Sequence, residues 1–181
     1  MRVAKKEIKD QAIIETLLAE AHVGRLGTMG QDGYPMIKPV NFVHHRGRIY
    51  FHSAPEGEKI DHILRDSRVC FEVDWPIGYV KSTGIPCRAD YLYRSVIIRG
   101  RAHLVAEREE KVVALKALME KYQPEGGYGS FPEDKLEMTS VVCIDIAMIT
   151  GKQDVGKEHE QPEVFRLLRG RSVPAAVLER S

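Results

Sequence analysis

The sequence predicts a mainly β protein, an antiparallel barrel with appended helices. Short strand-like segments follow one another along the chain and are separated by Asp-Gly and Arg-Gly turns. Apolar residues at helical spacing occur in only a few places, and strands and helices do not alternate regularly. The chain has 181 residues, of which 43% are hydrophobic and 29% charged, which suits one compact globular domain.

Charge and composition exclude several classes of protein. The formal net charge is +1, so the chain lacks the basic surplus of a nucleic-acid-binding protein. Nothing reads as a signal peptide, and the apolar runs are far shorter than the ~20 residues that cross a bilayer. The three cysteines are widely spaced and form no C-x-x-C pair, as in a reducing compartment. We therefore expect a cytoplasmic protein with no nucleic-acid partner, no membrane contact and no metal site.

The first part of the chain predicts one helix and then a meander of strands. Apolar residues at helical spacing favour an amphipathic helix over residues 8–21. Strand-like segments then fill residues 22–53, with a Gly-Gln-Asp-Gly turn and an Arg-Gly turn between them. Pro35 and Pro39 lack amide donors, so their strand is expected at a sheet edge or beside a bulge.

The middle of the chain predicts two helices and two strands around a loop. A short helix is expected over residues 57–66, and the alternation in residues 69–74 predicts a half-buried strand. Residues 75–92 contain two prolines and two glycines without a clear period, which predicts a long loop. Strand character resumes at residue 93, and residues 107–122 form the clearest amphipathic helix.

The last part of the chain predicts a closing strand and a polar tail. The glycine-rich stretch 124–130 lacks a phosphate-loop pattern and is interpreted as a linker. A final strand is expected over residues 139–152. We therefore expect a main domain over residues 1–152 and a tail over residues 153–181, whose amphipathic stretch EVFRLLR offers a packing surface to a partner subunit.

The stretch IYFHSAPEGEKIDHI permits two interpretations. Ser53 and Glu56 match a capping box, with Pro55 in the first helical turn, and Lys59 is then a solvated charge. The same helix start also offers unpaired N–H groups, the Ser53 hydroxyl and the Lys59 ammonium to an anion. The two interpretations are compatible, because a capped helix still has free donors.

Four stretches carry a resemblance to a known family: residues 22–63, VCFEVD, YRSVIIRGRA and TSVVCIDIAMITGK. In this order and spacing they resemble the flavin-nucleotide-binding proteins related to pyridoxamine 5′-phosphate oxidase, in the branch of the nitroimidazole-reductase-like proteins. The resemblance spans roughly residues 8–152. It implies an antiparallel FMN-binding split β-barrel and a homodimer with two flavin sites across the subunit interface.

The resemblance also implies the residues of the FMN site. Ser53 and Lys59 would contact the phosphate. Lys38, Pro39, Val40 and Asn41 would border the flavin ring, and Arg94 and Ser95 would approach it from another strand, from the second subunit. This chain has Glu58 before Lys59, where the oxidases have an Arg-Lys pair, so a phosphate meets fewer cations here. Vitamin B6 oxidation is therefore not expected.

His52 is the candidate for catalysis. Strand alternation directs its side chain opposite to those of Phe51 and Ser53. In the nitroimidazole-reductase-like branch a histidine at this position lies near the flavin, where its titration near neutrality suits proton delivery. The alternative is a hydrogen-bonded structural histidine. His62 and Asp61 are expected on a surface helix.

We therefore expect an FMN-dependent oxidoreductase that reduces a small, electron-poor, nitroaromatic-like molecule. The alternative is a non-catalytic flavin- or haem-binding module for storage or sensing, with His22, His52 or His103 as an axial ligand. A third interpretation, a regulatory protein whose barrel docks another chain, depends only on the amphipathic tail.

Overall fold

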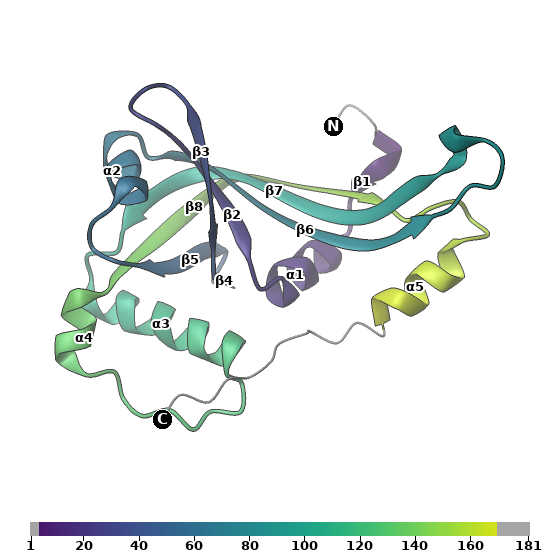
Figure 1. Ribbon diagram of the computed structural model, residues 1–181. Coiled ribbons are helices and arrows are strands. Elements are labelled where there is room, and N and C mark those ends of the chain that lie inside the picture. The colour runs from purple at the N-terminus through teal and green to yellow at the C-terminus, as the bar shows by residue number, and fades with distance from the viewer. Residues whose placement is uncertain (1–3, 170–181) are drawn as a thin grey trace.

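Eight strands build the sheet of the chain, whose residues 4–169 are described by a computed structural model. The strands are β1 (Glu7–Ile8), β2 (Gly24–Met29), β3 (Pro35–Val40), β4 (Val43–His45), β5 (Arg48–Ser53), β6 (Arg68–Val80), β7 (Asp90–Leu104) and β8 (Ser140–Asp154). They pair in the order β3-β2-β6-β7-β8-β5-β4, with β1 added to β8, and every pairing is antiparallel (Figure 1).

The helices lie around this sheet (Figure 1). They are α1 (Gln11–Glu20), α2 (Glu58–Arg65), α3 (Arg108–Tyr122), α4 (Glu133–Met138) and α5 (Gln161–Arg169), with the 3-10 turns η1 (Ala4–Lys6) and η2 (Pro86–Arg88). No helix within residues 4–169 is long and apolar enough to cross a bilayer.

The sheet is curled but not closed, which confirms the predicted split barrel. Strands β3 and β4 stand at the two ends of the pairing order. The edge position of β3 explains its two prolines, because neither Pro35 nor Pro39 has an N–H for a second neighbouring strand. The predicted Arg-Gly turn joins β4 to β5, with Arg46 at φ 51° and Gly47 at φ 75°.

The loop predicted over residues 75–92 is wrong. Strands β6 and β7 form one long ribbon that pairs from Arg68↔Arg101 to Val80↔Asp90, and only residues 81–89 connect them. A register shift between Pro76 and Gly78, which pair with Tyr93 and Leu92, leaves Ile77 between them as a bulge. The bulge interrupts the period-2 pattern, which is why the sequence pattern resembled a loop.

Two hydrophobic cores lie on opposite faces of β5. Ile49 and Phe51 belong to the larger core inside the curled sheet, which α1 closes and where Phe42 and Phe71 meet edge to face at 4.9 Å. Tyr50 belongs to a second core under α3 and α4. Because strand side chains alternate, one strand serves both cores.

One helix was not expected from the sequence, whereas the expected packing of the tail on a partner subunit stays a prediction. Helix α4 was not predicted, because six residues are too few for a helical period. The amphipathic stretch of the tail forms α5, which contacts β6 of its own chain and buries Val164.

We predict that Gly100→Ala destabilises the fold by about 2 kcal/mol or more. A Cβ at Gly100, beside the bulge in the β7–β8 pairing, would lie 2.3 Å from the backbone oxygen of Asp145. Denaturant unfolding measures the change in free energy. Gly129→Ala is the control, because a Cβ there meets nothing within 4 Å; an equal effect of both changes would contradict the explanation.

Candidate functional site

The connection from β5 to α2 is a turn in which Ser53 still belongs to the strand. Ser53 pairs with Ser140 of β8, and α2 begins only at Glu58. The N-cap residue is Gly57, at φ 129°, and no side chain caps the helix. The predicted capping box of Ser53 and Glu56 is therefore wrong, because the pairing with β8 holds Ser53 in extended conformation.

The Ser53 hydroxyl is buried and unpaired. Its residue is 6% exposed, and its Oγ has no hydrogen-bond partner among the described residues. A buried hydroxyl without a partner costs free energy, so native structures rarely retain one without a reason. The hydroxyl lies on the barrel side of β5, two residues after Phe51 and directly before the turn that leads to α2.

Two lysines from different parts of the chain converge beside this turn. Burial lowers the pKa of Lys59, and the positive charge of Lys38 on β3 lowers it further. The Lys59 Nζ lies 5.9 Å from the centre of the Phe51 ring. A second cation close to a partly buried lysine favours an anion between or beside the two.

Glu58 opposes an anion at the same place. Its carboxylate lies 2.5 Å from the Lys38 Nζ, so this lysine already has a partner. The first backbone bonds of α2 run from the N–H groups of Ile60 and Asp61 to the Gly57 carbonyl. The earlier N–H groups of the helix have no such intrahelical partner, which leaves a donor end for a phosphate despite Glu58.

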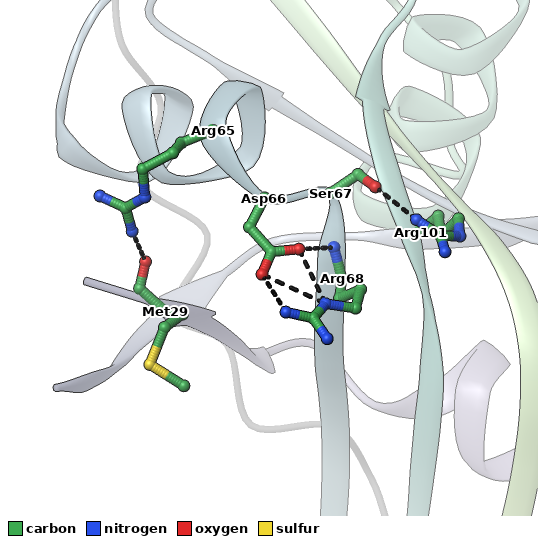
Figure 2. A network of polar contacts seen from close by, with 6 residues as sticks. All are labelled: Met29, Arg65, Asp66, Ser67, Arg68 and Arg101. Carbon is green, nitrogen blue, oxygen red and sulfur yellow. Dashed lines mark hydrogen bonds and ion pairs between the residues drawn. The ribbon is translucent and has the colours of Figure 1, made fainter. Parts of the chain in front are cut away.

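The position of α2 is fixed by contacts at its C-terminal half, and Figure 2 shows one set of them. Arg65 donates to the carbonyl of Met29 on β2. Beyond the helix, Asp66 accepts hydrogen bonds from the backbone and side chain of Arg68, which lower the pKa of Asp66 to about 2. Ser67 accepts a hydrogen bond from Arg101 of β7 at 3.1 Å.

His62 also anchors α2. The expectation that it lies on the surface is wrong, because His62 is buried and its Nδ1 lies 3.0 Å from the Thr28 hydroxyl of β2. The hydrogen bond between His62 and Thr28 replaces the bonds to water that both side chains lose on burial. These contacts determine where the helix start, and with it Lys59, is placed relative to β3.

His52 faces the opposite side of β5, as the alternation predicted. It lines a cavity of about 450 Å³ between β5, α3 and α4, together with Asn41. Asn41 lies two residues before β4, whose Val43 pairs with Tyr50 of β5. Tyr122 of α3 holds this corner: its hydroxyl accepts from the Phe42 N–H at 2.9 Å and lies 2.6 Å from the His22 carbonyl.

The other residues expected to border the flavin ring lie on β3, and their side chains point in different directions. Val40 is buried in the barrel core, so only its backbone can border a ligand, whereas Pro39 is exposed on the outer face. Lys38 points to the side of the sheet that carries Lys59 and Glu58. Because side chains alternate along β3, Pro39 therefore lies on the opposite face of the strand from Lys38 and Val40.

Arg94 and Ser95 lie far from the turn within one chain. Ser53 pairs with Ser140, whereas Arg94 pairs with Gln153, thirteen positions further along β8. At the usual strand rise this is roughly 40 Å of strand. Arg94 donates to the Gln153 side chain at 3.0 Å, and burial lowers its pKa. One chain therefore does not bring these two residues to Lys59.

The sequence missed the walls of the cavity. Phe131, Lys135 and Leu136 line it from the segment around α4. The glycine-rich linker and the six-residue helix have no periodic pattern that indicates a cavity. Leu115, Leu118 and Tyr122 were expected on one face of α3 but without a role.

The open antiparallel sheet defines the class of the fold, which is a split β-barrel. A family profile described as pyridoxamine 5′-phosphate oxidase matches residues 10–153, and the chain belongs to this family. This confirms the family expected from the sequence. No curated protein sequence matches the chain.

Solved structures share the fold. A protein from Bacteroides thetaiotaomicron described as a 5-nitroimidazole antibiotic resistance protein is 27% identical, with a TM-score of 0.70 over 81% of this chain and 86% of that one. The flavocytochrome Anf3 from Azotobacter vinelandii is 20% identical, with a TM-score of 0.77 over 100% and 86%. The FAD and haem binding protein from Mycobacterium smegmatis is 15% identical, with a TM-score of 0.78 over 97% and 91%.

Proposed function

We propose that the protein binds FMN and reduces a small electron-poor molecule. The observation that carries the proposal is the buried, unpaired Ser53 hydroxyl beside Lys59 at the start of α2. Two of the similar structures are named as flavin proteins and a third as a nitroimidazole resistance protein, which supports the same choice. A bound flavin would supply the electrons.

Different residues of this chain have different roles in the proposed function. Ser53, Lys59 and the free N–H groups of α2 hold the phosphate, and Lys38 joins them once Glu58 releases it. Pro39, Val40 and Asn41 border the ring, Val40 through its backbone. His52, beside Asn41 in the cavity, holds a proton for the molecule being reduced.

A homodimer completes this site in our proposal. Arg94 and Ser95 stand along β8 far from the turn of their own chain, so they serve the flavin bound by a second copy. Arg94 is half-buried and bonded to the neutral Gln153 rather than to a carboxylate, which leaves its charge available for an anionic flavin group.

The second candidate is a haem-binding module, and one observation favours it. Of the three histidines considered as axial ligands, His52 lines the cavity, whereas His103 lies 3.4 Å from the carboxylate of Asp145 on the sheet surface. The visible spectrum of the purified protein separates the two: we expect a flavin spectrum, as purified or after incubation with FMN. A Soret band with no uptake of FMN would show instead that the protein binds haem.

We predict opposite effects of two neighbouring changes on FMN affinity. Lys59→Ala removes a charge-assisted contact and weakens binding by about 1.5–3 kcal/mol. Glu58→Gln releases Lys38 and removes a repulsive charge, so it strengthens binding. Titration of FMN by fluorescence quenching measures both, with Lys116→Ala on the exposed face of α3 as the control. If Lys59→Ala leaves the dissociation constant unchanged, the phosphate lies elsewhere.

We predict that His52→Ala slows the reaction more than it weakens FMN binding, because the side chain faces away from the phosphate turn. The rate at which a nitroaromatic reoxidises the photoreduced, FMN-saturated protein under anaerobic conditions measures this effect. Equal losses of rate and affinity would show a structural role instead.

We predict that Lys59→Ala and Arg94→Ala chains complement each other in mixed dimers. If Arg94 acts across the interface, a mixed dimer has one site with both changes and one intact site. FMN titration of purified mixed dimers should then show about half of the sites with wild-type affinity. If Arg94 serves its own chain, no site is intact and every site binds weakly.

A further inference from the structure

The cavity beside His52 has a mainly apolar wall. Leu115, Leu118 and Met119 of α3 form one side, and Phe131 and Leu136 form another. Its volume of about 450 Å³ lies in the range of small-molecule sites. An apolar pocket of this size favours a flat aromatic or heteroaromatic body.

The polar side chains of the cavity are mostly hydrogen-bond donors or cations. They are Asn41, His52, Tyr122, Lys135 and Thr139, and no carboxylate is among the described residues that line it. An amide, an imidazole and an ammonium together complement an anionic oxygen group. The same set gives a cationic ligand no compensating charge.

Lys135 brings a largely exposed cation to the lining of the cavity. It lies on α4, and the Thr139 hydroxyl donates to its carbonyl at 2.8 Å, which holds the end of this helix. Its Nζ has an exposed partner, Asp134, at 3.5 Å, a pairing of little strength. The strand that follows sets Val141 beside His52, so α4 enters β8 next to the histidine.

The walls of the cavity are joined before any ligand binds. The Lys111 Nζ of α3 donates to the Leu136 carbonyl of α4 at 2.6 Å. Tyr122 fastens the other end of α3 to the backbone beside Asn41. Burial raises the pKa of Tyr122, so this hydroxyl keeps its proton and its hydrogen bonds at neutral pH. A preformed site loses little conformational entropy on binding.

We propose that this cavity is the binding site of the molecule to be reduced, and that it selects planar aromatic carboxylates. The aromatic ring lies against α3, and the carboxylate meets Lys135. The role as the site of the reduced molecule rests on the proposed flavin function, because Asn41 connects the end of the ring strand to the cavity. The binding preference itself does not depend on flavin.

Binding of 4-nitrobenzoate and of its neutral methyl ester to the full chain tests the proposal. Isothermal titration in the absence and presence of saturating FMN gives both affinities. We expect the acid to bind more tightly than the ester in both conditions. Equal affinities, or tighter binding of the ester, would overturn the selection of carboxylates.

Two pairs of variants locate the binding site. Met119→Trp fills the cavity and should weaken both compounds at least tenfold, whereas Glu120→Trp, on the exposed neighbouring position, should change neither. Lys135→Gln should weaken the acid by roughly fivefold and spare the ester, whereas Lys116→Gln should change neither. Undiminished binding in Met119→Trp would overturn the location.

The outcomes separate this inference from the proposed function. If the variants change the affinity for 4-nitrobenzoate as expected but FMN does not bind, the cavity assignment stands and the flavin function fails. If FMN binds and 4-nitrobenzoate does not, the flavin function stands and the cavity assignment fails. If both bind, turnover should follow the same order, with a KM for the acid that rises in Lys135→Gln at unchanged FMN affinity.

Discussion

Strand β5 is buried on both of its faces, and the rest of the site depends on this constraint. Phe51 fills the barrel core, and Tyr50 enters the core under α3. A shift of one residue in the β5–β8 pairing would exchange these two faces, so both cores oppose it. The next two residues follow the same alternation: the side chain of His52 is directed to the cavity and that of Ser53 to the barrel side. In the function that we propose, the groups for phosphate binding and for proton transfer are thereby separated by one peptide unit.

The turn after β5 holds polar groups that belong to neither hydrophobic core. Ser53 is buried without a partner, Lys59 is partly desolvated, and Lys38 is held by Glu58. The first two features cost free energy in the free protein and an anion would offset them, whereas the exposed ion pair of Lys38 and Glu58 would have to open before Lys38 could join the anion. The carboxylate of Glu58 makes such an anion site weaker than one with two free cations. Exchange of a ligand for this internal anion is consistent with a cofactor that binds reversibly.

The shape of the sheet explains why the candidate residues fall in three places. The turn and the cavity lie on opposite faces of β5, whereas Arg94 lies on β7, opposite the distant end of β8. An open barrel leaves edges and faces available to a second copy, and a two-fold dimer brings such distant ends together in pairs. The cavity under α3, in contrast, is built by one chain alone and is held by the contacts of Lys111 and Tyr122.

The sequence by itself determined the features that depend on neighbours along the chain. Period-2 alternation predicted the buried side of β6 and the opposite directions of His52 and Ser53, and the prolines predicted that β3 lies at a sheet edge or beside a bulge. The family followed from the order of four strand motifs. Only the tertiary structure decided the rest. Pairing with β8 held Ser53 in the strand and moved the helix start to Glu58. Packing of α2 on β2 buried His62, and pairing with β7 drew Pro76 and Gly78 into a ribbon. These outcomes depend on contacts between residues far apart in the sequence, whose free energies exceed the local preferences of turns and caps.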